Sequence, residues 1–463
     1  MIIMYQIDFN KPANIHFIGI GGISMSGLAE LLCSKGFRIT GSDSHESDIT
    51  DHLETLGIKI YYGQRPENIA EDTDLVVYTA AISPDNPEYM EAVNKKIPML
   101  VRADMIGQIM KNYQNAIAVA GTHGKTTTTS LLTHIYVDAD LDPTVSVGAT
   151  LDILHGNVRV GGSKNWIMEA CEYTNSFLSF NPTVSIILNI EEDHLDFFKD
   201  INDIRHSFRL FAEKLPADGI LIINKDIDNY EEICQGLPCK VVTYSSKDSS
   251  ADYYSADITY NERDCGSYDL YVRGEKKGHP SLNIIGEHNV SNSLAAIAAA
   301  YEQGVSLDNI KLGLKSFHGA DRRFQIKGDL AGITIVDDYA HHPSEIAATL
   351  KSAATFPNKS VWCVFQPHTY TRTKAFLKEF AASLSLADHV IVTDIYAARE
   401  KDPGDISSKD LYNEMVKLGV DCYYISDFEE IKNFILTNCV NGDMLITMGA
   451  GDVVTIGDDL LGY

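Results

Sequence analysis

The residues best suited to chemistry follow a hydrophobic run at 116–120, where the chain reads GTHGKT at 121–126. Glycines at this point let successive backbone N–H groups turn inward, and a helix that begins at the lysine adds positive potential at the same place. The lysine can reach the outer phosphates of a nucleotide, and the hydroxyl after it can bind Mg²⁺. The order of these features predicts a phosphate-binding loop, although Val119 replaces the first glycine of the usual G-x-x-x-x-G-K-[ST] string.

A second glycine turn, GIGGIS at 19–24, lies between a predicted strand at 15–20 and a predicted helix at 24–35. It resembles a dinucleotide-binding motif with a serine as its third glycine, and an aspartate ends the next predicted strand, where it could bind a ribose. A tight turn without any ligand has the same pattern. Because a separate phosphate loop follows about a hundred residues later, we interpret this turn as a diphosphate site. Its candidate substrate-binding residues are Gly19, Gly21, Gly22, Ser24, Met25 and Asp43.

Two polar loops follow further predicted strands of the same series. Glu172 comes just after a strand at 166–170, and His194 comes just after a strand at 184–188. If both strands are parallel neighbours of the phosphate-loop strand, both side chains reach the sheet edge that holds the phosphates. Acidic loops are more often solvated turns, but oxygen and imidazole groups beside a phosphate loop favour a Mg²⁺ site.

Four further segments carry candidate ligands. GEHNVSN at 286–292 precedes an alanine-rich helix, so it could contact a nucleotide or could simply cap that helix. The pair Arg322 and Arg323 could clamp a phosphate or could be a surface pair. DDYAHHP at 337–343 and QPHTYTR at 366–372 each follow a predicted strand and would face one crevice. Adjacent histidines rarely bind one metal, so we favour a substrate-binding role over zinc.

These residues must be positioned by alternating strands and helices, which indicate an α/β fold with parallel sheets. A chain of 463 residues is too long for one core, and roughly 150 residues per domain suggests about three domains. We expect domains at 1–113, 114–324 and 325–463. The polar stretch 245–278 is predicted to form edge hairpins within the second domain.

The composition excludes several other classes of protein. The net charge of −26 argues against nucleic-acid binding, which needs clustered lysine and arginine. No segment approaches the ~20 apolar residues of a membrane span, and the N-terminus lacks the pattern of an export signal. The eight cysteines form no Cys-x-x-Cys pair, so we expect reduced thiols and a cytoplasmic protein.

Together these strings resemble the Mur ligase family: GIGGISMSG, GTHGKTTTT, the Glu172 loop, NIEEDH, GEHNVSN, RRF, DDYAHHP, QPHTYTR and GAGD. The resemblance covers nearly the whole chain. It implies a Rossmann-like N-terminal domain for a UDP-sugar, a central P-loop ATPase domain and a Rossmann-like C-terminal domain. The opening GIGG-x-x-MSG is similar to that of members that add L-alanine to UDP-N-acetylmuramate, through an acyl phosphate, in peptidoglycan synthesis.

The resemblance also implies roles for single residues. Lys125 would stabilise the transferred phosphoryl group, and His341 and Arg372 would bind the incoming L-alanine. Thr126, Glu172 and His194 match positions associated with Mg²⁺. The residues implied to bind ATP are Gly121, Thr122, His123, Gly124, Lys125, Thr126, Thr127, His288, Asn292, Arg322 and Asp338.

Two departures from the family pattern and several alternatives stay open. Many members carry D-E-S-D where this chain has CEYT at 171–174, so the acidic neighbours of the metal-binding glutamate are in doubt. The region 205–209 offers no lysine for the carbamylation found in several sister ligases. A ligase for a preformed peptide or another amino acid, a regulatory P-loop ATPase and a dinucleotide-dependent oxidoreductase are the rival hypotheses. The sequence does not decide between a monomer and a homodimer.

Overall fold

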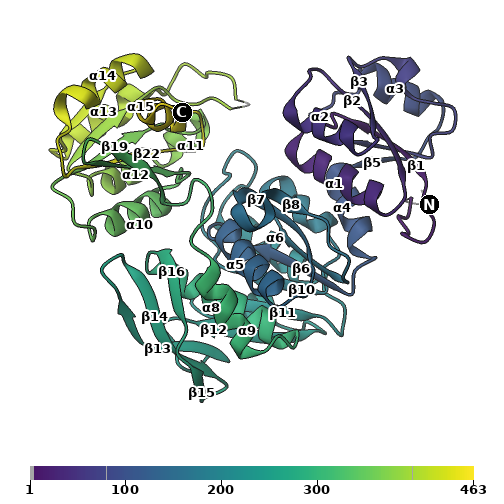
Figure 1. Ribbon diagram of the computed structural model, residues 1–463, viewed down its shortest axis with the longest axis horizontal. Helices are drawn as coiled ribbons and strands as arrows, with labels where there is room; N and C mark the ends of the chain where they lie inside the picture. Colours follow the sequence, from purple (N-terminus) through teal and green to yellow (C-terminus); the bar gives the residue numbers. More distant parts are fainter. Residues whose placement is uncertain (1–4, 80, 399) are drawn as a thin grey trace.

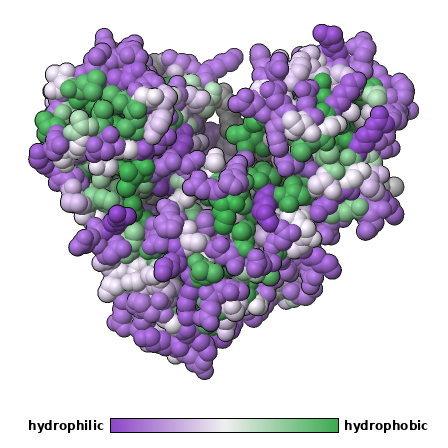
Figure 2. Space-filling model, viewed as in Figure 1, coloured by the Kyte–Doolittle hydropathy of each residue, from purple (hydrophilic) through white to green (hydrophobic). Residues whose placement is uncertain are grey.

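The computed structural model describes residues 5–79, 81–398 and 400–463. Three α/β units follow one another along the chain, as the sequence predicts, and each is built around its own sheet (Figure 1). The outer two units lie on either side above the middle one. Figure 2 shows a notch between the outer units, with hydrophobic side chains gathered beneath it.

The first sheet is parallel throughout and has the order β3-β2-β1-β4-β5, which makes the unit Rossmann-like. Its strands are β1 (Asn14–Ile18), β2 (Arg38–Asp43), β3 (Lys59–Tyr62), β4 (Leu75–Tyr78) and β5 (Met99–Val101). Its helices are α1 (Ile23–Ser34), α2 (Asp48–Thr55), α3 (Pro87–Asn94) and α4 (Arg102–Met110).

The middle sheet is mostly parallel, with the path β15-β14-β13-β12-β11-β10-β6-β9-β7-β8 and with β16 paired to β14. Its strands are β6 (Asn115–Ala120), β7 (Thr144–Leu151), β8 (Gly156–Arg159), β9 (Asn165–Glu169), β10 (Val184–Ile187), β11 (Ile220–Asn224), β12 (Lys240–Ser245), β13 (Tyr253–Tyr260), β14 (Cys265–Val272), β15 (Glu275–Gly278) and β16 (Ser281–Ile285). Strands β13 to β15 pair antiparallel at the sheet edge, which confirms the predicted hairpins.

The α-helices of this middle unit are α5 (Lys125–Asp138), α6 (Ile201–Ala212), α7 (Tyr230–Cys234), α8 (His288–Glu302) and α9 (Leu307–Ser316). The small side chains of the alanine-rich helix α8 let it pack closely against α5, and Ala295 to Ala300 are completely buried. The helix start that carries the phosphate loop is therefore held against a rigid core.

The third sheet has the order β17-β18-β22-β19-β20-β21 and is parallel except for β17. Its strands are β17 (Gln325–Leu330), β18 (Ile333–Asp338), β19 (Val361–Phe365), β20 (His389–Val392), β21 (Cys422–Tyr424) and β22 (Met444–Met448). Its helices are α10 (Pro343–Ala353), α11 (Tyr370–Ala375), α12 (Leu377–Leu384), α13 (Ser408–Lys417), α14 (Phe428–Asn438) and α15 (Val454–Leu461). Within the described ranges, no helix is both long and apolar enough to cross a bilayer.

Candidate active site

The phosphate loop, Glu172 and His194 meet at one edge of the middle sheet. Strand β6 lies between β9 and β10 and pairs parallel with both. The loops that follow these three strands therefore leave from the same edge, as the sequence predicts.

Two glycines give the phosphate loop its shape. Gly121 and Gly124 have φ angles of +149° and +82°, which disfavour side chains. A Cβ atom at Gly124 would lie 2.5 Å from Asn292 Oδ1, and one at Gly121 would lie 2.8 Å from Leu188 Cβ. The loop thus fits closely between β10 and α8, and Lys125 starts helix α5 directly after it.

The Lys125 ammonium connects the loop to the acidic side of the site. Its Nζ donates to the carbonyl of Thr122 at 3.0 Å and lies 3.1 Å from Glu172 Oε2. Burial lowers the pKa of Lys125, but the adjacent Glu172 carboxylate outweighs this effect and the pKa is raised. Lys125 is therefore a fixed cation at the point where outer phosphates would lie.

An imidazole lies beside two carboxylates at the same sheet edge. His194 Nε2 lies 3.8 Å from Glu172 Oε1 and 3.7 Å from Asp193 Oδ2. The Tyr173 ring packs against the His194 ring with centroids 4.6 Å apart. Burial lowers the pKa of His194, which favours the neutral form that binds metals. Asp193 was missed from the sequence, although it stands next to His194 in the same acidic string.

A cleft between the middle and C-terminal units continues from the phosphate loop. It encloses about 980 Å³, including open space at its mouth. The predicted nucleotide residues on its wall are His123, Gly124, Thr126, Thr127, His288, Asn292 and Asp338.

The two adjacent arginines beside this cleft make different contacts. The Arg322 guanidinium donates to Asp337 Oδ2 at 2.9 Å and to the Gly449 carbonyl at 2.8 Å, so it joins parts of the C-terminal unit. Arg323 lines the cleft instead. The pattern of adjacent arginines could not show which of the two faces the nucleotide.

His123 of the phosphate loop contacts the C-terminal unit. Its Nδ1 lies 3.0 Å from Glu345 Oε1, and its Nε2 lies 3.5 Å from Glu191 Oε2. Burial lowers the pKa of His123, but the two carboxylates outweigh this effect and raise the pKa to about 9. His123 is therefore a cation that joins the two units at neutral pH.

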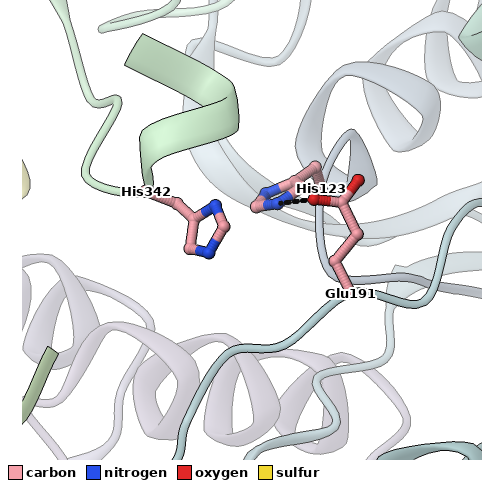
Figure 3. Close-up of side chains that lie close together, drawn as sticks. All are labelled: His123, Glu191 and His342. Atoms are coloured by element: carbon pink, nitrogen blue, oxygen red, sulfur yellow. Dashed lines mark ion pairs between the residues drawn. The ribbon is translucent and has the colours of Figure 1, made fainter. Parts of the chain in front are cut away.

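His342 completes a group of possible metal ligands with His123 and Glu191 (Figure 3). Both nitrogens of the protonated His123 carry hydrogens: Nδ1–H is directed at Glu345 and Nε2–H at the Ser344 hydroxyl, at 3.1 Å. His342 Nε2 lies 3.0 Å from the Glu192 carbonyl. Such nitrogens have no lone pair free for a metal. We interpret the group as an ion-pair contact between the units.

Arg372 and His341 reach the catalytic loops from the C-terminal unit. Arg372 Nε and Nη2 donate to Asp193 Oδ1 at 3.0 and 2.9 Å, and both side chains are buried. Burial raises the pKa of Asp193, but the guanidinium outweighs this effect and holds the pKa well below its usual range. Burial lowers the pKa of His341 to about 4, so this imidazole is neutral. Arg372 thus binds the carboxylate of Asp193, and its Nη1 lies 3.0 Å from His368 Nδ1, so in this structure the guanidinium links the two units.

The N-terminal glycine turn is held by the predicted aspartate. Asp43 Oδ2 accepts a hydrogen bond from the Gly21 N–H at 2.8 Å, and Gly19 has a φ of +80°. The Ser24 hydroxyl accepts a hydrogen bond from Arg102 Nη1 at 2.9 Å. The side chain of Met25 is buried in the core beneath the turn.

This fold and this site define a class of protein: the chain belongs to the Mur ligase family. Residues 14–114 match the model "Mur ligase family, catalytic domain", 119–300 match "Mur ligase middle domain" and 322–451 match "Mur ligase, glutamate ligase domain". Members of this family are ATP-dependent ligases, which accounts for the phosphate loop.

Relatives of known name match along the full length. The UDP-N-acetylmuramate--L-alanine ligase of Lachnoclostridium phytofermentans is 57% identical over 467 residues, 99% of this chain and 100% of that protein. The ligase of the same name from Lachnospira eligens is 58% identical over 458 residues, with the same coverage. The crystal structure of UDP-N-acetylmuramate-alanine ligase from Thermotoga maritima has a TM-score of 0.79 and 29% identity, covering 97% of this chain and 98% of that one. A murein peptide ligase from Psychrobacter arcticus has a TM-score of 0.70 and 26% identity, with the same coverage.

Proposed function

We propose that this chain joins L-alanine to the lactyl carboxylate of UDP-N-acetylmuramate and converts ATP to ADP and phosphate, a step in peptidoglycan synthesis. One observation carries the proposal. The Lys125 ammonium and the Glu172 and His194 side chains lie at one sheet edge, and Arg372 of the C-terminal unit reaches the same place. A phosphoryl-transfer site and a carboxylate-binding site are therefore adjacent. The full-length relatives support the choice of substrates.

The chemistry requires activation because a carboxylate anion resists attack by an amine. A carboxylate oxygen of the sugar attacks the γ-phosphorus of ATP, the bond to the bridging oxygen breaks, and ADP leaves. The Lys125 cation offsets the negative charge that develops on the transferred group. The amine of alanine then attacks the carbonyl carbon of the acyl phosphate, phosphate departs, and the amine loses a proton. The amide bond is the product.

Thr126, Glu172 and His194 fit a Mg²⁺ ion. Glu172 offers a buried carboxylate, and burial keeps the His194 imidazole in its neutral form. Thr126 stands at the start of α5, where a hydroxyl commonly binds the nucleotide-associated ion. Bound there, Mg²⁺ would offset negative charge on the phosphates.

We assign the three predicted domains one substrate each. Residues 1–113 would bind the UDP-sugar at the glycine turn, residues 114–324 would bind ATP, and residues 325–463 would bring alanine through His341 and Arg372. Closure of the last two domains over the substrates would exclude water, which otherwise hydrolyses the acyl phosphate. All eight cysteines are free, which fits a reducing cytoplasm.

A phosphate-release assay tests the proposal. We expect release only when ATP, UDP-N-acetylmuramate and L-alanine are all present, and a loss of about 10³-fold in Lys125→Ala, since one preorganised charge at a transition state contributes roughly 10²–10³ in rate. The likeness to a murein peptide ligase makes a tripeptide the informative rival substrate. Faster turnover with tripeptide than with alanine, or no ATP consumption with all three substrates, would overturn the assignment.

A further inference from the structure

Arg102 lies where the N-terminal and middle units meet. It is the first residue of α4, directly after β5, and its side chain is part-buried. Helix α4 packs against the segment Tyr173–Ser179, which follows the catalytic Glu172. The Ser179 hydroxyl donates to Asp104 Oδ1 at 2.6 Å and fastens this helix to the catalytic loop. The position of Arg102 is thus coupled to the catalytic loop.

The guanidinium of Arg102 has few partners within the protein. Among the residues that the structure describes, its side chain makes one hydrogen bond, to Ser24 Oγ at 2.9 Å, and no carboxylate lies within ion-pair distance. The part-buried Arg322 and the buried Arg372 both contact aspartates. Arg323, the other part-buried arginine without a carboxylate in the described ranges, lines the nucleotide cleft. In a chain of net charge −26, a part-buried arginine without an acid implies an anion from outside.

Two neighbours define the place that this anion would occupy. Ser24 belongs to the glycine turn of α1. The segment Tyr173–Ser179, against which α4 packs, directly follows Glu172. Arg102 therefore lies between the glycine turn and the phosphoryl-transfer site, where a nucleotide sugar must extend to bring its carboxylate to ATP.

We propose that Arg102, anchored by its hydrogen bond to Ser24, binds the diphosphate of the nucleotide-sugar substrate. This inference rests on the proposed function, since it takes the ligand from there. The planar guanidinium keeps donors free after its bond to Ser24, and paired N–H groups match phosphate oxygens. Neither the glycine motif nor its spacing pointed to Arg102, because 78 residues separate it from Ser24.

Calorimetric titration of the full chain without ATP tests the proposal. Arg102→Met removes the charge and keeps the apolar stem, and Arg102→Lys keeps the charge without the paired donors. Arg38→Met is the matched control, because Arg38 is in the same unit but is exposed and paired with Asp72. The titrants are UDP-N-acetylmuramate, UDP-N-acetylglucosamine, which lacks the lactyl acid, and UDP.

We expect Arg102→Met to weaken the binding of all three titrants by a similar factor of about 10 to 100, since loss of the guanidinium removes charge-assisted hydrogen bonds to phosphate. Arg102→Lys should recover part of the loss, and Arg38→Met should bind normally. In turnover, the KM for the nucleotide sugar should rise while the KM for ATP and kcat stay near their normal values.

Three results would overturn the inference: equal binding by Arg102→Met, a loss confined to UDP-N-acetylmuramate, which would assign the arginine to the lactyl acid, or a fall in kcat at unchanged KM. If Arg102→Met does not fold, Ser24→Ala tests the same contact and should weaken the binding of all three titrants. Unchanged binding by Ser24→Ala would also count against the proposal. Failure of the unaltered chain to bind any titrant refutes the proposed function itself. Binding by the unaltered chain and equally by Arg102→Met refutes only this inference.

Discussion

Replacing Asp193 with asparagine tests whether the contact between the middle and C-terminal units drives catalysis. Asp193 receives two hydrogen bonds from Arg372, at 3.0 and 2.9 Å, and the two side chains are only 7% and 8% exposed. Asparagine preserves the shape but leaves the guanidinium buried without its counter-charge. The variant therefore isolates the charge of one ion pair.

The magnitude follows from the geometry of the pair. Each charge-assisted hydrogen bond contributes about 1.5–3 kcal/mol, so two contribute about 3–6 kcal/mol. Removing one partner of a buried ion pair costs about 3–5 kcal/mol, which agrees with the sum of the two hydrogen bonds. Because the partners belong to different units, the cost falls on the closed arrangement and not on the fold of either unit. At 1.4 kcal/mol per factor of ten, closure should become roughly 10²–10⁴ times less favourable.

The assay is phosphate release under steady-state conditions. We expect kcat/KM for alanine to fall by about 10²–10⁴ in Asp193→Asn, while the melting temperature changes little. Glu192→Gln is the control, because Glu192 is an exposed carboxylate one residue away. Small-angle scattering with bound nucleotide should report a more extended particle for Asp193→Asn. A change in kcat/KM below threefold, or an equal effect of Glu192→Gln, would refute the reasoning.

Three further predictions concern other parts of the molecule. The pKa of His123 is raised to about 9, so the protonated imidazole should stabilise closure fully below about pH 6.5 and lose this stabilisation as the pH rises through 9. His123→Asn should therefore flatten the alkaline limb of the pH profile of kcat/KM. An unchanged pH profile would contradict the prediction. Glu88 is buried beside Ser42 and Asn68 with a lowered pKa, so Glu88→Gln should cost about 1–3 kcal/mol in urea unfolding at pH 7 and less at pH 4, where the native contribution is itself being lost. Gly124→Ala should abolish ATP binding in calorimetry, because its Cβ would lie 2.5 Å from Asn292 Oδ1 at a φ of +82°; normal affinity would show that the loop has another shape.

Several elements of this protein could not be predicted from the sequence. The strands that were not predicted are β3, β7, β8, β11, β12, β16, β17 and β21. Strands β3, β8 and β21 have only three or four residues each, which is too few for a clear alternating pattern. The domain boundaries at 113 and 324 stay predictions. The roles given to individual site residues also stay predictions, although the structure brings most of them together.

The sequence by itself determined the α/β class, the phosphate loop at 121–126 and the glycine turn at 19–24. Each of these features depends on residues within about ten positions of one another. The conformations that glycine allows and the position of the helix N-terminus therefore determine the two loops locally. Only the tertiary structure decided which groups meet: His123 with Glu345, Arg372 with Asp193, and Arg102 with Ser24. These partners are 222, 179 and 78 residues apart, so their contact depends on how sheets and domains pack, and no local pattern encodes that packing.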